Sequence, residues 1–267
     1  MGRTVSKGLA MNVIMLGIIA SLGAGLMTGV GAIPVLFGRT MSQRTNDTLL
    51  GFAAGVMISA SYFSLILPGL EAGDELYGVV WISAAIAAGG IALGALAVAF
   101  LNETLPHEHF VVGPEGADPG ALSKIWLFII AITIHNFPEG MAVGIGFGGG
   151  NVANGMSLAT GIGLQNAPEG LAVAVALRGQ GYSKIRSFTL ALLTGLVEPV
   201  GGALGVGLIH ISQHILPWGL TFAAGAMLYI ISHEIIPETH RKGYQNHATT
   251  GLIVGLILMM FLDVTLG

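Results

Sequence analysis

Two segments of this chain place polar side chains and a proline inside apolar runs. They read TIHNFPEGMAVG at 133–144 and GLQNAPEGLAVA at 163–174. Each holds a His or Gln, an Asn and a Glu in the same order, and these are His135, Asn136, Glu139, Gln165, Asn166 and Glu169. Because the first and third members of each set are four residues apart, they share one face of a helix. A third carboxylate, Glu198, precedes Pro199 in another apolar run.

These polar groups are predicted to meet near the centre of a membrane. His135, Gln165 and Glu198 each lie about 15 Å from the nearer end of their apolar runs, at about 1.5 Å per helical residue. The hydrocarbon core of a bilayer is about 30 Å thick, so all three positions fall close to its mid-plane.

Carboxylates at this depth need compensating positive charge. An ionised carboxylate at mid-bilayer costs at least ~2.5 kcal/mol even on the mildest insertion scale. No Lys or Arg lies in the core of any apolar run, so the compensation must come from protons or metal ions. Imidazole, carboxylate and amide oxygen together suit zinc and its first-row neighbours better than sodium or potassium. Pro138, Pro168 and Pro199 each free a carbonyl one turn earlier, and such a carbonyl is tolerated only if a cavity, an ion or a neighbour satisfies it.

The composition requires that the elements carrying these groups lie in a membrane. Of 267 residues, 53% are hydrophobic and 9% are charged, whereas soluble domains carry roughly 25% charged residues. The mean hydropathy is +0.80. The 42 glycines fit tightly packed transmembrane helices. The chain has no cysteine, which excludes disulfides and thiolate ligands.

Eight apolar stretches are long enough to cross a bilayer, which takes about 20 residues. They cover residues 8–37, 48–70, 78–101, 124–147, 152–177, 185–211, 216–237 and 249–266. The connections are short, and the inner loop 102–123 is the longest. We therefore expect an all-α membrane protein with a single polytopic transmembrane domain over residues 1–267.

The loop charges predict the orientation of the chain. If the N-terminus is outside, the inner side receives Arg39, Arg44, Lys124, Arg178, Lys184, Arg186, Arg241 and Lys242. The outer side keeps only Arg3 and Lys7. Because cytoplasmic loops are enriched in Lys and Arg, we expect a protein of the cytoplasmic (inner) membrane with both termini on the extracellular or periplasmic side.

An internal repeat relates the second span to the seventh. FAAGVM at 52–57 resembles FAAGAM at 222–227, and Pro68 and Pro237 follow at similar distances. In the predicted topology these two spans cross the membrane in opposite directions. Spans 1–3 and 6–8 would then form an inverted repeat around the central pair 4–5, an arrangement typical of secondary transporters.

Three classes of function fit these features in part. The first is a transporter of divalent metal ions. The second is an intramembrane zinc-dependent enzyme, favoured by His135 and Glu139 on one helix face, although the sequence contains no His-Glu-x-x-His and has many carboxylates to fill an open zinc position. The third is a proton-translocating module whose carboxylates carry only protons. Metal flux into proteoliposomes would separate them.

The paired motifs HNFPEG and QNAPEG, with SHEIIPETH at 232–240 and FLDVTLG at the C-terminus, resemble the ZIP (Zrt/Irt-like) family of divalent-metal transporters, in its prokaryotic GufA-type branch. The resemblance covers essentially all eight spans. It implies a transporter rather than an enzyme, and a helix bundle that carries the metal and slides against a scaffold. The cargo implied is Zn²⁺, with Cd²⁺, Fe²⁺ or Mn²⁺ as further substrates, and we expect no organic cofactor.

The resemblance also implies a binuclear site between the fourth and fifth spans. One metal would be held by Met57, His135, Glu139, Gln165 and Glu169. The second would be held by Asn136, Asn166 and Glu198, with Glu139 and Glu169 bridging the two ions.

Two of the implied ligands raise separate questions. Many family members have histidine where this chain has Gln165, and a neutral amide oxygen is a weaker ligand. The thioether of Met57 would favour cadmium or zinc over magnesium or calcium. From the sequence alone, Met57 is equally well explained as a packing residue.

Residues outside the motifs are candidates for the pathway of the ion. Glu71 would attract cations at the outer mouth or merely solvate a loop, and Ser64 and Asp263 lie within the second and eighth spans. On the inner side the candidates are His107, His109, His233 and Glu234. The expected partners are divalent metal ions and the lipid bilayer, without nucleic acid. The sequence leaves open whether the protein forms a homodimer.

Overall fold

The computed structural model describes residues 2–38, 41–105, 107–109, 113–115, 124–241 and 243–266. Side chains are described for 13–38, 41–105, 129–130, 132–241 and 243–265. The predicted loop residues Lys124, His107 and His109 therefore have a described backbone only, and Arg39 and Lys242 lie outside the described residues.

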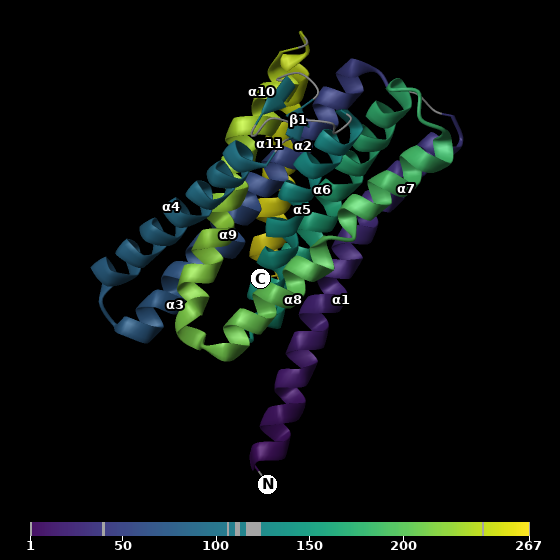
Figure 1. The fold of residues 1–267 in the computed structure, drawn as a ribbon. Coiled ribbons are helices and arrows are strands. Elements are labelled where there is room, and N and C mark those ends of the chain that lie inside the picture. The colour runs from purple at the N-terminus through teal and green to yellow at the C-terminus, as the bar shows by residue number, and fades with distance from the viewer. Residues whose placement is uncertain are drawn as a thin grey trace.

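Long helices make up most of this structure (Figure 1). In chain order they are α1 Gly2–Leu36, α2 Gln43–Ala60, α3 Leu67–Tyr77, α4 Val80–Thr104, α5 Lys124–Gly148, α6 Val152–Gly179, α7 Lys184–Gly195, α8 Glu198–Ile211, α9 Leu216–Ile230, α10 Ile236–His240 and α11 Gln245–Leu266. Two π-helices, η1 Ser61–Ile66 and η3 Ile231–Ile235, and a 3-10 turn, η2 Gln213–Ile215, join neighbouring helices. Strands β1 His107–His109 and β2 Gly113–Glu115 pair in antiparallel fashion.

Six helical segments in the described part of the chain are long and apolar enough to cross a membrane. They are Val13–Leu36, Gln43–Tyr77, Val80–Thr104, Lys184–Ile211, Gln213–His240 and Gln245–Thr265. Several extend beyond the predicted stretches, because α2 and α3 continue through η1 and because α9 and α10 continue through η3. The helices that carry the two motifs, α5 and α6, are not among the six. The polar motif lowers the hydropathy of α6, and the side chains of α5 are described without interruption only from Ile132.

Polar side chains cap the starts of two of these helices. Ser42 accepts a hydrogen bond from the amide of Thr45 at the start of α2, and Asn151 accepts one from the amide of Asn154 at the start of α6. These side chains satisfy amides that a helix start otherwise leaves without a partner.

The helices pack most extensively within two sets. We name α1, α5, α6, α7 and α8 the motif group, because it carries both motifs and Glu198; in it α1 packs on α6 and α5 packs on α8. We name α2, η1, α3, α4, α9, η3, α10 and α11 the frame group; in it α2 packs on α11 and α4 packs on α9. The two groups meet where α2 and α11 contact α6 and where α9 contacts α5.

The two copies of the internal repeat adopt the same local structure. FAAGVM ends at Met57 in α2 and is followed by η1 from Ser61; FAAGAM ends at Met227 in α9 and is followed by η3 from Ile231. The two segments run in opposite directions in Figure 1, since α3 lies at the lower end of the molecule and α10 at the upper end.

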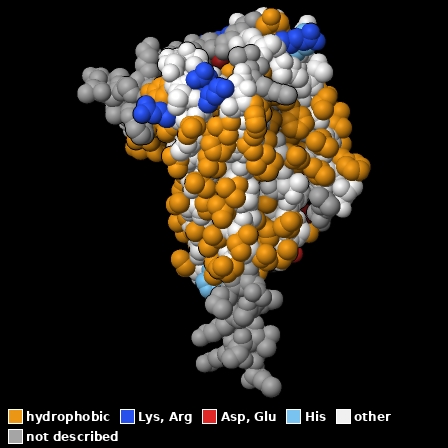
Figure 2. All heavy atoms as spheres, turned by 90° about the vertical axis from the view of Figure 1, so that its right-hand side faces the viewer, with side chains coloured by type: hydrophobic (Ala, Val, Ile, Leu, Met, Phe, Trp, Pro, Cys, Tyr) orange, Lys and Arg blue, Asp and Glu red, His pale blue; other side chains and the backbone are white. Residues whose placement is uncertain are grey.

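Charge separates the two ends of the molecule. Figure 2 shows Lys and Arg side chains gathered at one end, above a broad hydrophobic surface. We name this end, with exposed Arg44, Arg178, Lys184, Arg186 and Arg241, the cationic end. The opposite end, where α3 exposes Glu71, Asp74 and Glu75, is named the acidic end.

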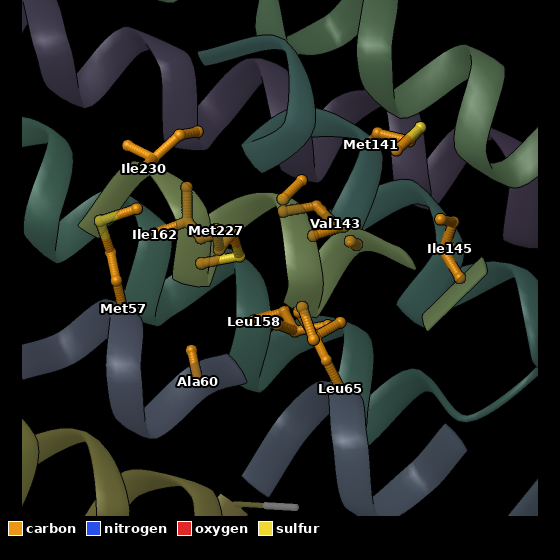
Figure 3. Packing of buried hydrophobic residues seen from close by; sticks show 14 of the residues in the cluster. Met57, Ala60, Leu65, Met141, Val143, Ile145, Leu158, Ile162, Met227 and Ile230 are labelled. Atoms are coloured by element: carbon orange, nitrogen blue, oxygen red, sulfur yellow. The ribbon is translucent and has the colours of Figure 1, made fainter. Parts of the chain in front are cut away.

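Buried apolar side chains fill the interface between the groups on the acidic side of the motifs. Ala60 and Leu65 of the frame group lie in one cluster with Leu158 and Ile162 of α6 and Met227 of α9 (Figure 3), and each is at most 2% exposed. On α6, Leu158 and Ile162 precede Gln165, so this cluster lies between the motifs and the acidic end. We name it the apolar plug.

Candidate metal centre

Both motifs lie within continuous helices despite their prolines. Pro138 lies inside α5 and Pro168 inside α6. Asn136 and Glu139 are at most 1% exposed, as are Gln165 and Asn166. The four polar side chains are therefore enclosed by protein.

The third carboxylate lies where a membrane-crossing segment is broken. Helix α7 ends at Gly195 and α8 begins at Glu198, with Pro199 in its first turn. A proline in the first turn costs no hydrogen bond, because the first amides of a helix have no intrahelical partner. Glu198 is fully buried, so the break places a carboxylate inside the protein.

The glycine that ends each motif allows a neighbouring helix to approach closely. A Cβ on Gly140 would lie 2.0 Å from the carbonyl oxygen of Glu198 in α8. A Cβ on Gly170 would lie 1.9 Å from the carbonyl oxygen of Thr28 in α1. The motif glycines thus bring α8 against α5 and α1 against α6.

Two amides hold two of the carboxylates. Gln165 Nε2 donates to Glu139 Oε1 at 2.6 Å. Asn166 Nδ2 donates to Glu198 Oε1 at 2.6 Å and to the carbonyl oxygen of Ala24 at 2.9 Å. These bonds use the amide nitrogens and one oxygen of each carboxylate, which fixes the orientation of the remaining oxygens.

Five buried side-chain oxygens of the two motifs and Glu198 have no hydrogen-bond partner within the protein, and neither has Asn136 Nδ2. The oxygens are Asn136 Oδ1, Glu139 Oε2, Gln165 Oε1, Asn166 Oδ1 and Glu198 Oε2. A buried polar atom without a partner costs free energy, and carboxylate and amide oxygens are metal ligands. The unsatisfied oxygens therefore fit a cation as their partner.

The carboxyl groups of three helices interact across this centre. Glu139 interacts electrostatically with Glu169 and Glu198, and Glu169 interacts with His135. In the described part of the chain, however, no three His, Asp or Glu side chains come close enough to hold a metal without other donors. The amide oxygens are thus needed to complete a coordination sphere.

His135 pairs with a carboxylate outside the two motifs. Its Nε2 pairs with Glu234 Oε2 of η3, and Asn102 Nδ2 of α4 donates to Glu234 Oε1 at 3.2 Å. Asn102 was expected at the start of the inner loop 102–123, whereas it lies inside α4 and is buried. The contact between His135 and Glu234 therefore joins the motif group to the frame group.

A cavity of about 450 Å³ reaches this centre from the cationic end. His135, Glu169 and Glu234 contribute polar atoms to its wall, and Gln43 and Gln180 line it close to the helix ends. Its lining includes residues of α6 from Glu169 to Gly179, and Gln180 just after the helix. Of the polar motif residues, only His135 and Glu169 line this cavity, so it reaches the edge of the centre from the cationic end, and the apolar plug lies on the other side of the motifs.

Met57 lies in the apolar core next to this centre. Its side chain is fully buried and belongs to the same hydrophobic cluster as Ile162 (Figure 3). This position satisfies the packing explanation, and coordination by the Met57 thioether stays a prediction.

The structure brings together two of the predicted pathway residues, Ser64 and Asp263. Ser64 Oγ donates to Asp263 Oδ1, and Ser157 Oγ of α6 donates to the same oxygen at 2.6 Å. All three side chains are buried. Glu71, by contrast, is exposed at the acidic end.

The remaining inner pathway candidates lie toward the cationic end. His233 is exposed, with its ring centroid 5.0 Å from that of Tyr229. His107 and His109 lie on β1, which contacts α5.

Sequence reasoning missed three partners in this region: Asn102, Ser157 and the carbonyl group of Ala24. An asparagine at the end of an apolar run resembles any loop boundary, and a serine in a membrane helix commonly bonds to its own backbone. Nothing in the sequence distinguishes the Ala24 carbonyl from its neighbours.

Comparison with known proteins agrees with this geometry. Residues 120–263 match the family model described as ZIP Zinc transporter. The chain is 47% identical to the zinc transporter GufA of Myxococcus xanthus, over 94% of this chain and 99% of that protein. It is 46% identical to the zinc transporter ZIPB of Bordetella bronchiseptica, over 90% of this chain and 78% of that protein. It is 34% identical to human zinc transporter ZIP11, over 90% of this chain and 94% of that protein. With buried carboxylate and amide oxygens on membrane helices and relatives along nearly its whole length, this chain belongs to the ZIP family of zinc transporters, which are membrane transporters rather than enzymes.

Proposed function

We propose that this protein carries Zn²⁺ inward across the cytoplasmic membrane. The observation that carries the proposal is the set of five buried, unpartnered oxygens on Asn136, Glu139, Gln165, Asn166 and Glu198. No Lys or Arg occurs in the motif segments, and a divalent cation would satisfy these oxygens and balance the carboxylate charge.

The donor set supports a transition metal as cargo. His135 adds an imidazole beside Glu169, and imidazole with carboxylate suits zinc and related ions better than calcium or magnesium. Cadmium, iron and manganese are further candidate substrates. The three relatives are likewise named as zinc transporters.

We propose two metal positions that share bridging carboxylates. Glu139 with Gln165, and Glu198 with Asn166, form two separate amide–carboxylate pairs. Each pair presents one unpartnered carboxylate oxygen and one unpartnered amide oxygen. The first position would add His135, Glu169 and Met57, and the second would add Asn136, with Glu139 and Glu169 bridging.

The proposed mechanism is an elevator-like alternation of access. The motif group would slide against the frame group, so that the centre opens first to one end and then to the other. The cavity at the cationic end and the apolar plug on the other side support an inward-open state. In this proposal the cationic end is cytoplasmic, since Lys and Arg are enriched there, and both chain termini are outside.

The arrangement of helices supports an inverted repeat within one domain of eight spans. The pairing of α1 with α6 corresponds to that of α8 with α5, and the pairing of α2 with α11 corresponds to that of α9 with α4. The matching π-helices η1 and η3 occupy corresponding places in the two halves. Alternating access around a site between two such halves is a known transporter design.

Zinc uptake into proteoliposomes tests the function. Purified protein should carry Zn²⁺ down a concentration gradient, and Glu139→Ala, reconstituted to the same density, should not. Acidification of the vesicles without zinc entry would instead favour the proton-translocating alternative. Zinc uptake equal to that of empty vesicles, from protein shown to be folded, would refute the proposal.

An introduced thiol tests the alternation. Ala60 is fully buried in the apolar plug, and the native chain has no cysteine. In Ala60→Cys, a membrane-impermeant thiol reagent applied to the acidic end should react in the outward-open state and not in the state described here. Zinc should change the extent of labelling, whereas a static pore predicts identical labelling with and without zinc.

A further inference from the structure

Among the described residues, polar contacts cross between the motif group and the frame group toward both ends of the molecule. Toward the cationic end, His135 of α5 pairs with Glu234 of η3. Toward the acidic end, Ser157 of α6 donates to Asp263 of α11 at 2.6 Å. The cavity opens beside the first contact, whereas the apolar plug adjoins the second, since Ser157 precedes Leu158 in the chain.

Asp263 receives one hydrogen bond from each group on the same oxygen. Ser64 of η1 belongs to the frame group, so its bond to Asp263 Oδ1 stays within that group. Ser157 belongs to the motif group, so its bond to Asp263 Oδ1 spans the interface. Ser64 and Ser157 are each 1% exposed and Asp263 is 8% exposed. Water therefore competes little for the two hydrogen bonds among these three side chains.

The contact at the cationic end has a related arrangement. Aligning Met57 with Met227 places Ser64 of η1 opposite Glu234 of η3. Each of these π-helix residues bonds to a long frame helix, Ser64 to Asp263 of α11 and Glu234 to Asn102 of α4. Each π-helix contact is joined by one further bond to the motif group: Ser157 donates to Asp263, and His135 pairs with Glu234.

We propose that the hydrogen bond between Ser157 and Asp263 is a latch that keeps the acidic end closed while the cationic end is open. This inference rests on the proposed alternating access. If α6 slides against α11, Ser157 leaves Asp263, and the apolar plug separates with it because Leu158 and Ile162 move on the same helix. Ser157 is thus a positioning residue for transport, without a role as a metal ligand.

The closed state should lose population when this bond is removed. A hydrogen bond to a charged group is strong enough for its loss to shift a two-state ratio by roughly tenfold. Ser157→Ala should therefore raise labelling of Ala60→Cys from the acidic end by about tenfold in the absence of zinc. Ser64→Ala removes a bond to the same oxygen within the frame group, and it should leave the labelling ratio near that of the Ala60→Cys parent.

The outcomes separate the latch from the transport mechanism. Equal effects of Ser157→Ala and Ser64→Ala, or no effect of Ser157→Ala on zinc-responsive labelling, would overturn the latch and leave alternating access standing. Labelling of the parent that never responds to zinc would instead overturn the alternation itself.

Paired cysteines provide a second measurement that does not depend on the plug reporter. In Ser157→Cys with Asp263→Cys, bridging by a short bifunctional thiol reagent should stop zinc uptake, because it ties the two groups together. In Ser64→Cys with Asp263→Cys, the same bridge lies within the frame group, so forming it should reduce uptake far less than forming the Ser157–Asp263 bridge does. Each pair is compared with its own unbridged form, so the shared loss of Asp263 cancels. Continued uptake with the Ser157–Asp263 bridge formed would overturn the proposal.

Discussion

Gly140 offers no ligand, yet Gly140→Ala should weaken zinc binding at the metal centre. A Cβ at this position would lie 2.0 Å from the carbonyl oxygen of Glu198, and real Cβ contacts essentially never fall below 3.0 Å. The obstructing atom is backbone, so α5 and α8 must separate by about 1 Å locally. Asn166 Nδ2 donates to Glu198 Oε1 at 2.6 Å, and a displacement of about 1 Å takes this pair beyond hydrogen-bonding distance.

Gly140→Ala should cost more free energy through overpacking and a lost hydrogen bond than the higher helix propensity of alanine returns. Overpacking costs about 1–3 kcal/mol, and the lost hydrogen bond to a charged group costs about 1.5–3 kcal/mol. Replacing a helical glycine by alanine returns only about 0.5–1 kcal/mol. Since about 1.4 kcal/mol corresponds to a factor of ten, the KM for zinc should rise at least tenfold if the displaced Glu198 is a ligand.

The assay is zinc uptake into proteoliposomes at matched protein density. Gly207→Ala is the matched control, because Gly207 also lies in a helix of this interface, α8, and a Cβ there would meet nothing within 4 Å. Its KM should equal that of the parent protein. Gly170→Ala should behave like Gly140→Ala, since its Cβ would lie 1.9 Å from the carbonyl oxygen of Thr28. If both Gly140→Ala and Gly170→Ala had the KM of the parent protein, close helix packing at these glycines would not determine where the ligands lie.

Three further predictions concern the ligands themselves. Glu139→Ala should abolish zinc uptake while the protein still inserts, whereas Glu198→Ala should retain part of it because Glu198 serves only the second metal position; the reverse order would contradict the proposed bridging role of Glu139. Gln165→His should lower the KM for zinc with an unchanged or reduced maximal rate, because imidazole is a stronger ligand than an amide and a carrier must also release its ion; a raised KM would count against Gln165 as a ligand. Zinc at a hundredfold excess over its Kd should stabilise the folded protein by ~2.7 kcal/mol in thermal unfolding, and a chelator should remove this gain, so an unfolding midpoint indifferent to zinc would argue against a metal site in the folded state.

Composition and spacing were enough to predict a helical membrane protein. The apolar runs predicted helices over 124–147 and 152–177, because a bilayer tolerates few alternatives to a helix, and the structure has α5 at Lys124–Gly148 and α6 at Val152–Gly179. His135, Gln165 and Glu198 were predicted at one depth inside the membrane, and all three are buried in the structure; their role as metal ligands stays a prediction.

Composition and spacing did not predict the π-helices or the contacts between residues far apart in the chain. The π-helices η1 and η3 depend on packing that apolar periodicity does not encode, although the repeated FAAG segments precede both. The bond from Ser157 to Asp263 joins residues 106 positions apart, and its choice among many serines depends on how α6 and α11 are placed in space. The orientation of His135 toward Glu234 depends likewise on the relative position of the two helix groups.

The packing of α1 on α6 has a consequence for how the chain is made. Helix α1 ends at Leu36 and α6 begins only at Val152, so at ordinary rates of synthesis on the order of ten seconds separate their appearance. During that interval α1 has no α6 to pack against, and the polar motif makes α6 a weak candidate for independent entry into lipid. We therefore expect α6 to enter the bilayer with help from helices already there, with α1 as its principal receptor. Truncated nascent chains should then integrate α6 efficiently when α1 is native and poorly when Gly31→Leu blocks the approach of Ala167, whose carbonyl oxygen would lie 1.9 Å from a Cβ on Gly31.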